Sequence, residues 1–94
     1  MTVADRIRAK LTRALQPTRL EIHDDSHRHA GHAGARPGGE SHFRLELVSP
    51  AFAGKTRLER QRLVYALLAQ ELQDAVHALQ LSTLTPEEDK SRAR

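Results

Sequence analysis

The sequence predicts a single small α/β (α+β) domain with the element order αββαβ, in which a three-stranded mixed sheet carries its helices on one side. Apolar residues recur every three to four positions in residues 3–15 and alternate with polar residues in 18–23 and 42–47. A helix-capping signal opens residues 57–72. Ninety-four residues, of which 38% are hydrophobic, can bury one core but not two.

The first segment is expected to be an amphipathic helix. Thr2 is placed to cap its N-terminus, Asp5 to close the cap and Pro17 to stop the helix. In the segment that follows, Leu20 and Ile22 alternate with polar neighbours, which is typical of a half-buried strand. The apolar residues of the helix are Val3, Ile7, Leu11, Ala14 and Leu15.

A second strand is expected over residues 42–47, antiparallel to the first, and Pro50 ends it. Thr56 and Glu59 then form a capping-box pattern at the start of a long helix. Residues 63–69 of this helix are apolar almost all round, so we expect them to be buried between the sheet and the first helix.

A short apolar run at residues 76–82 predicts a third strand, with Leu79 and Leu81 facing the core. Thr85 and Pro86 are typical of a helix N-cap and first position, so a short helix is expected to follow the strand.

The predicted domain covers residues 1–88 and contains one flexible loop. Residues 24–40 are rich in Gly, His and short polar residues, which leave little to pack. The charged residues 89–94 are expected to form a disordered tail. The histidines inside the loop are His27, His29 and His32.

The composition restricts the chemistry that the chain can offer. It contains no cysteine, so disulfides and thiolate nucleophiles are excluded and imidazole is its only soft metal ligand. The net charge of +3, from 15 Lys and Arg against 12 Asp and Glu, is too balanced to identify a nucleic-acid binder. No stretch of about 18 apolar residues is present, so we expect a cytoplasmic protein that binds no membrane.

His77 opens the C-terminal apolar run and is the first candidate ligand. Strand alternation would put it on the face of Leu79 and Leu81, so the simpler interpretation is a partly buried histidine hydrogen-bonded to the backbone. A position at the start of the strand would instead present a ring nitrogen to a partner. The loop histidines leave a similar choice between functional ligation and adventitious binding of nickel or zinc.

Basic residues gather at the start of the long helix. The simpler interpretation is a solvated first turn. Because positive charge at a helix N-terminus opposes the helix dipole, the cluster also hints at an anionic partner, either nucleic-acid phosphate or glutathione carboxylates. The basic cluster consists of Lys55, Arg57, Arg60 and Arg62.

The sequence offers no pattern typical of an enzyme. Ser41 and His42 are neighbours, but alternation along a strand would send them to opposite faces, so they are not expected to act as nucleophile and base. Neither a Gly-x-Ser-x-Gly segment nor a phosphate-cradling loop is present.

Five short blocks resemble the signature segments of BolA proteins. The resemblance covers residues 2–88, with the blocks in the family order and at compatible spacing. It implies a class II KH-like (BolA-like) fold. The blocks are Asp24-Asp25-Ser26, Glu40-Ser41-His42-Phe43, Phe52-Ala53-Gly54-Lys55, Leu58-Glu59-Arg60-Gln61-Arg62 and Val76-His77-Ala78-Leu79.

The resemblance also implies a function. BolA proteins are partners of monothiol glutaredoxins in handling [2Fe-2S] clusters, and members are also described as DNA-binding transcriptional regulators. In the shared cluster, a glutaredoxin cysteine and glutathione supply thiolates, while the BolA-like partner supplies a C-terminal histidine and one loop ligand. These ligands correspond here to His77 and to His29, with His32 as the alternative.

Two departures from the family pattern are visible. The loop carries extra residues, with 30–36 as the inserted region, and this insertion leaves the choice between His29 and His32 open. The family's Arg-His-Arg in the long helix is Arg60-Gln61-Arg62 here, so any role of the middle histidine is missing.

We therefore expect a non-catalytic adaptor that docks a monothiol glutaredoxin and shares a bridging [2Fe-2S] cluster in iron-sulfur assembly, trafficking or iron sensing. The isolated chain should be a monomer without a cofactor. The alternative is a DNA-binding transcriptional regulator that contacts DNA through the basic cluster.

Overall fold

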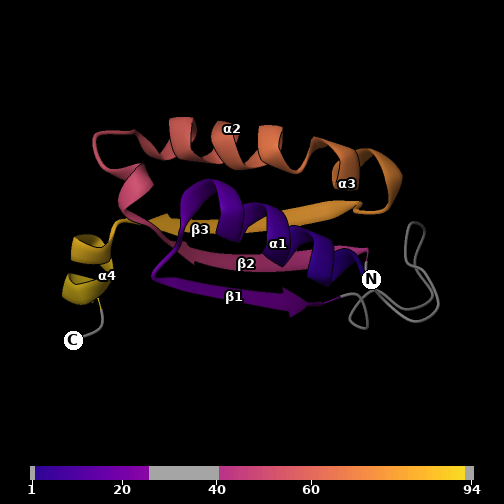
Figure 1. The fold of residues 1–94 in the computed structure, drawn as a ribbon, viewed down its shortest axis with the longest axis horizontal. Coiled ribbons are helices and arrows are strands. Elements are labelled where there is room, and N and C mark those ends of the chain that lie inside the picture. The colour runs from indigo at the N-terminus through magenta and orange to yellow at the C-terminus, as the bar shows by residue number, and fades with distance from the viewer. Residues whose placement is uncertain (1, 26–40, 93–94) are drawn as a thin grey trace.

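The computed structural model describes residues 2–25 and 41–92, and its elements follow the predicted order (Figure 1). The helices are α1 (Val3–Leu15), the 3-10 helix η2 (Pro50–Phe52), α2 (Arg57–Leu67), α3 (Ala69–Asp74) and α4 (Pro86–Arg92), and the strands are β1 (Arg19–Asp24), β2 (His42–Val48) and β3 (Ala78–Leu84). Most of the predicted loop at 24–40 lies outside the described residues; within it, Asp24 is the last residue of β1.

Two capping boxes set the starts of α1 and α2, as the sequence predicts. The Thr2 hydroxyl accepts a hydrogen bond from the Asp5 N–H at 3.0 Å, and the Asp5 carboxylate accepts one from the Thr2 N–H at 3.1 Å. Thr56 and Glu59 form the same reciprocal pair at 3.1 and 2.7 Å. At the other end of α1, Gln16 adopts a left-handed backbone with φ of 45°, which ends the helix.

β2 is the central strand of a sheet with the order β1-β2-β3. It pairs antiparallel with β1 and parallel with β3, which confirms the predicted mixed sheet. One face of β2 enters the core, where Phe43, Leu45 and Leu47 are at most 2% exposed. We call the opposite face of the sheet the open face; its residues include Glu21, His23, Arg44 and Glu46.

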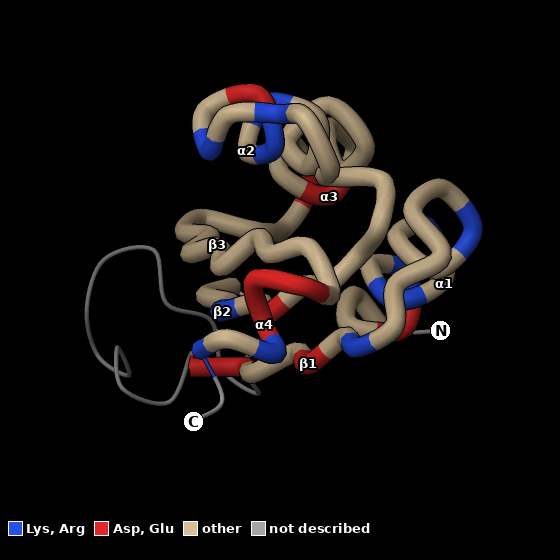
Figure 2. Tube along the Cα trace, turned by 90° about the vertical axis from the view of Figure 1, so that its left-hand side faces the viewer, with Lys and Arg blue, Asp and Glu red and all other residues tan. Residues whose placement is uncertain are grey.

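α1, α2 and α3 lie on one side of the sheet, and α4 lies at one end of it (Figures 1 and 2). Ile7 and Leu11 of α1 and Val64 of α2 are fully buried in the same core as the apolar face of β2. α4 buries none of its residues, and its Arg92 donates a hydrogen bond to the Ser82 hydroxyl at 3.2 Å.

The second long helix is broken at Leu68, between α2 and α3, where the sequence predicts continuity. Residues 63–69 are also not buried all round, because Tyr65 is 40% exposed while Val64 and Leu68 are at most 1% exposed. A helix that covers one side of a sheet buries a single stripe, so the predicted burial of the whole stretch is wrong.

β3 begins at Ala78 and ends at Leu84, two residues later than predicted at each end. Val76 is only 5% exposed and belongs to the core before the strand begins, which explains the shift. Leu79 and Leu81 pack against the core as predicted.

α4 continues to Arg92, so the predicted disordered tail at 89–94 is wrong for residues 89–92. The Thr85 hydroxyl accepts a hydrogen bond from the Glu88 N–H at 3.1 Å, and the Glu88 carboxylate accepts the Thr85 N–H at 2.9 Å. Asp89 is 2.7 Å from the Arg19 guanidinium, which ties the helix to β1.

A buried carboxylate joins α3 to α1. Glu71 is fully buried and lies 2.9 Å from Lys10 Nζ and 3.0 Å from the Arg6 guanidinium. Burial raises the pKa of Glu71, but the hydrogen bond from Lys10 and the charges of Lys10 and Arg6 outweigh this effect and hold the pKa below its ordinary value of 4.5.

Glu71→Gln should lower the free energy of unfolding at neutral pH by about 1–3 kcal/mol, because an amide cannot satisfy both cations. Because the pKa is lowered in the folded state, the carboxylate stabilises the protein above the ordinary pKa of 4.5, and this stability is lost as pH falls through the folded-state pKa. Urea unfolding at about pH 7 and about pH 2 should show the difference from wild type shrinking at the lower pH. The control is Glu87→Gln at an exposed position of α4, and equal effects of the two substitutions would contradict the role of Glu71.

Candidate functional site

One end of the sheet brings together the end of β1 and the starts of β2 and β3 (Figure 1). We call it the histidine end, because His42 opens β2 and His77 directly precedes β3. The parallel register pairs His42 with Ala78, and the centroids of the His42 and His77 rings lie 6.3 Å apart. Two imidazoles that are distant in sequence are therefore neighbours in the fold.

Ser41 positions both histidines. It is fully buried, its carbonyl accepts the His77 N–H at 2.7 Å and the Ala78 N–H at 3.3 Å, and its hydroxyl lies 2.8 Å from His42 Nδ1. The backbone of His77 is thus fixed while the residue is exposed. The simpler sequence interpretation, a partly buried His77, is wrong, and an exposed ring at the end of the sheet is suited to ligation shared with a partner.

The contact between Ser41 and His42 corrects another expectation. Ser41 precedes β2, so strand alternation does not send the two side chains apart. The pair still gives no support to a hydrolase, because Ser41 is 0% exposed and its hydroxyl cannot meet a substrate.

The predicted loop ligands His29 and His32 lie outside the described residues. The residues that flank this segment are described, and both are at the histidine end. On the N-terminal side of this segment, the Asp25 N–H donates a hydrogen bond to the His42 carbonyl at 2.8 Å. On its C-terminal side, Ser41 is the first described residue.

The basic cluster lies at the opposite end of the sheet, where α2 begins and β3 ends (Figure 1). Three of its members are exposed and a fourth is buried. Arg60 is 8% exposed, and its guanidinium donates to the Thr83 carbonyl at 3.0 Å and pairs with Glu88 at 2.6 Å. The exposed members are Lys55, Arg57 and Arg62.

Arg60 has a structural role that the sequence does not reveal by charge alone. Its guanidinium carbon lies 5.8 Å from the centroid of the Phe52 ring, and its hydrogen bond to Glu88 is the main reason that the pKa of this carboxyl falls to about 2. The residue therefore links α2 to β3 and α4, and its contacts within the fold do not favour its assignment to a phosphate-binding site.

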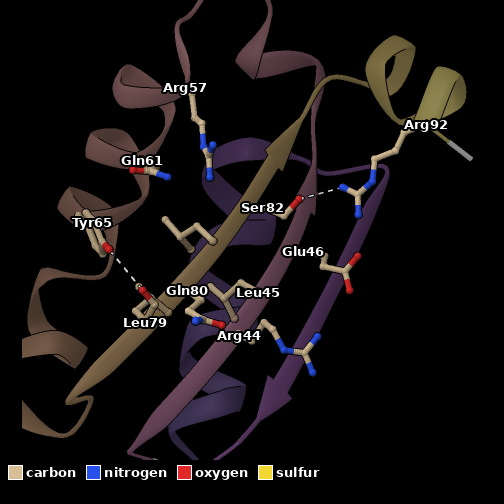
Figure 3. A pocket seen from close by; sticks show the side chains of 11 residues that line it. Arg44, Leu45, Glu46, Arg57, Gln61, Tyr65, Leu79, Gln80, Ser82 and Arg92 are labelled. Carbon is tan, nitrogen blue, oxygen red and sulfur yellow. Dashed lines mark hydrogen bonds between the residues drawn. The ribbon is translucent and has the colours of Figure 1, made fainter.

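A groove crosses β3 between α2 and β2, and Arg57 of the basic cluster lines it (Figure 3). Arg57, Gln61 and Tyr65 line it from α2, and Ser82 lines it from β3. Arg92 reaches the groove from α4. Arginines from two helices therefore border the same groove.

His42 and Arg92 are candidate site residues that sequence reasoning missed. The proximity of His42 to His77 depends on the register between β2 and β3, which local alternation does not reveal. Arg92 falls in the predicted disordered tail, because residues 89–94 are charged and carry no apolar stripe.

The fold and the site define a small α+β domain with a three-stranded mixed sheet and an exposed histidine beside the start of its third strand. The family model described as BolA-like protein matches residues 11–88, and the chain belongs to this family. The predicted family and fold are thereby confirmed.

Relatives and a solved structure agree with this result. The chain is 48% identical over 87 residues to SufE-like protein 1, chloroplastic/mitochondrial, of Arabidopsis thaliana, which covers 88% of this chain and 24% of that protein. It is 47% identical over 88 residues to the DNA-binding transcriptional regulator BolA of Escherichia coli (strain K12), covering 94% and 80% of the two chains. The solved structure of BolA1 from Arabidopsis thaliana matches with a TM-score of 0.83 and 40% identity, over 94% of this chain and 96% of that one.

The chain spans 24% of the SufE-like protein and 57% of Protein BOLA1, chloroplastic, from the same plant. The names of these two plant relatives place them in organelles. The cytoplasmic location stays a prediction. Within residues 2–25 and 41–92, no helix combines the length and apolar character needed to cross a membrane.

Arg60→Gln should lower the free energy of unfolding by about 1–3 kcal/mol, because the buried Thr83 carbonyl loses its charged donor. Chemical denaturation measures this loss. Arg62→Gln removes an exposed arginine from the same helix and should change stability by less than about 0.5 kcal/mol. A similar loss at both positions would show that Arg60 has no special structural role.

Proposed function

We propose that this chain is a non-catalytic adaptor that binds a monothiol glutaredoxin and shares a bridging [2Fe-2S] cluster with it, with His77 as a ligand. The observation that carries the proposal is the exposed His77, whose backbone is held by Ser41 at the histidine end. Because the chain has no cysteine, the thiolate ligands must come from the glutaredoxin and from glutathione.

The residues at the histidine end fit such a shared site. An exposed imidazole on a fixed backbone can meet a partner without a change in this fold, and a neutral ring supplies the nitrogen lone pair that iron accepts. His29, or His32 as the alternative, belongs to the segment whose flanking residues reach the same end, and we propose it as the second ligand.

Ligation by imidazole instead of thiolate would change the chemistry of the cluster. A neutral nitrogen ligand adds less negative charge to iron than a thiolate does, as the histidine ligands of Rieske centres show. Replacing two thiolates by histidines should therefore raise the reduction potential relative to an all-thiolate site. This chain would alter the reactivity of the cluster that its partner carries, without catalysing a reaction.

A [2Fe-2S]-loaded monothiol glutaredoxin with glutathione should give a new visible circular dichroism spectrum when titrated with this protein, saturating near an equimolar ratio. His77→Ala should not produce the spectrum, because the fixed ligand is lost. His23→Ala, which removes a histidine from the open face, is the matched control and should behave as wild type.

His29→Ala and His32→Ala, tested in the same titration, identify the second ligand. The variant that fails to give the wild-type spectrum marks the loop residue that the shared site uses. A wild-type titration without any spectral change would sink the shared-cluster proposal, and an unchanged spectrum with His77→Ala would remove His77 from it.

A second candidate function is DNA binding, favoured by the exposed members of the basic cluster beside the groove that Arg92 borders. Phosphate contacts by such side chains supply affinity without sequence preference. The relative from Escherichia coli is named a DNA-binding transcriptional regulator, and this name supports the same candidate.

The double variant Arg57→Glu/Arg62→Glu should weaken binding to a DNA duplex and reduce the salt dependence of log K by about 2, since each phosphate contact contributes a slope of about 0.9. Fluorescence anisotropy over a range of salt concentrations measures both quantities. Arg60 is left intact because of its contacts in the fold, and His77→Ala serves as the control with unchanged binding. Unaltered affinity and slope in the double variant would rule out the basic cluster as the DNA contact.

A further inference from the structure

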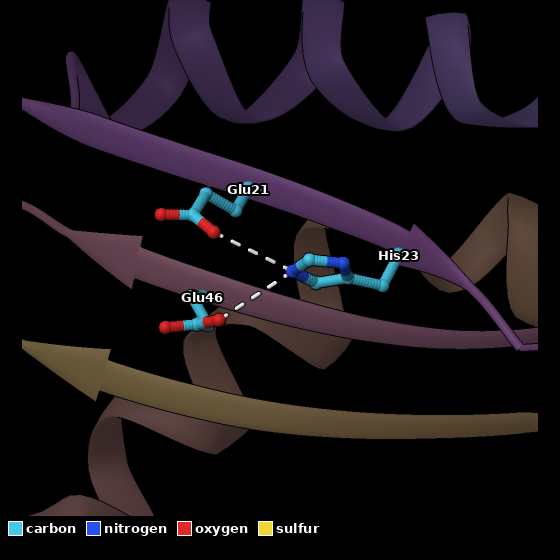
Figure 4. Close-up of side chains that lie close together, drawn as sticks. All are labelled: Glu21, His23 and Glu46. Atoms are coloured by element: carbon cyan, nitrogen blue, oxygen red, sulfur yellow. Dashed lines mark ion pairs between the residues drawn. The ribbon is translucent and has the colours of Figure 1, made fainter.

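Three potential metal ligands meet on the open face (Figure 4). Glu21 and His23 are two residues apart on β1, so both side chains emerge on the same face. Glu46 of β2 lies directly opposite Glu21 in the antiparallel register. The ligand atoms of the three residues all lie within 4.8 Å of one another.

The histidine nitrogen at the centre of this group has no satisfying partner. His23 Nε2 lies 3.5 Å from Glu21 Oε1 and 3.4 Å from Glu46 Oε2, and it is a buried atom without a hydrogen bond. A buried ring nitrogen that lies between two carboxylates without a hydrogen bond to either costs free energy. A metal ion that binds this nitrogen and the two carboxylates at once would satisfy all three side chains.

The distances favour a metal ion. Ligand atoms bound to a tetrahedral zinc ion at about 2.0–2.1 Å are separated from one another by about 3.3–3.4 Å. The separations of 3.4 and 3.5 Å from His23 Nε2 to the two carboxylate oxygens match this spacing, and they exceed the length of about 2.7–2.9 Å expected for a charge-assisted hydrogen bond.

The second oxygens of the two carboxylates are held by an arginine. Arg19 Nη1 lies 2.6 Å from Glu21 Oε2 and 3.3 Å from Glu46 Oε1, so each carboxylate turns its other oxygen toward His23. Outer contacts that orient ligands in this way are a regular feature of protein metal sites.

We propose that Glu21, His23 and Glu46 bind one divalent transition-metal ion, with zinc as the ion that the two separations from His23 Nε2 fit and solvent at the fourth position. Nitrogen and carboxylate ligands are those that zinc accepts when thiolates are lacking, and three protein ligands leave one position open. The site uses none of the proposed cluster ligands and stands apart from the proposed function. The nearby charge of Arg19 opposes the ion and limits its affinity.

Zinc binding by the loop histidines must be removed before this site can be measured. The full-length protein with His27, His29 and His32 replaced by glutamine provides that background, and isothermal titration with zinc chloride is the measurement. We expect one ion per chain. Adding His23→Gln or Glu46→Gln should weaken zinc binding by about tenfold or more, because one of three ligands is lost.

His77→Gln in the same background is the matched control and should leave zinc binding unchanged. Thermal unfolding of each variant without metal checks that the fold is retained, and zinc should then raise the melting temperature of the background but not of His23→Gln. The proposal is overturned if the background binds no zinc, or if His23→Gln binds zinc as tightly as the background. Because none of these measurements involves a glutaredoxin, their failure leaves the shared-cluster proposal to its own test.

Discussion

The register of the central strand β2 is the constraint on which the rest of the structure depends. Its apolar positions, such as Leu45, fill the core, and a slip of one residue would expose them and bury charged neighbours. The same register puts His42 beside the start of β3 and Glu46 opposite Glu21. Burial of the apolar face of β2 therefore fixes the positions of the residues at the histidine end and of the ligand group on the open face.

Local signals predicted most of this fold because they act within a few residues. The Thr2 and Thr56 capping boxes each involve a partner three positions away, and strand alternation has a period of two. The approach of His42 to His77 could not be predicted in this way, because it arises from a parallel pairing between strands that a helical crossover separates. Sequence reasoning identified His77 as a candidate ligand from its place at the start of the apolar run, and the family resemblance then favoured ligation over the partly buried interpretation.

The helical spacing of Arg60 indicates that it is buried, although its charge favours a position on the surface. Arg60, Val64 and Leu68 are spaced by four residues, and all three are buried, so they form one stripe of the helix that faces the core. The charge of Arg60 suggested a surface role like that of Arg57, which lies outside the stripe. Helical position decides which arginine is structural and which is left to meet a partner, since a buried guanidinium requires hydrogen-bond acceptors that only the fold can place.

Charged side chains add links between the elements of the fold. Glu71 links α3 to α1, Arg60 links α2 to α4, and Arg19 links β1 to α4 through Asp89. Only 3% of the residues are aromatic, so the core has few large side chains with which to hold these junctions. In these ion pairs the guanidiniums of Arg19 and Arg60 are already engaged with carboxylates of the fold.

The separation of the histidine end from the basic cluster limits how the two candidate functions could affect each other. Strands paired in one register and packed in one core resist sliding, so binding at one end of the sheet should not shift the other end. Coupling between two sites requires that a ligand favour one of two arrangements. If iron-sulfur binding at His77 controls contact with DNA, the bulk or charge of the bound partner must reach the basic cluster. A small ligand that binds the imidazoles at the histidine end should leave DNA binding unaltered.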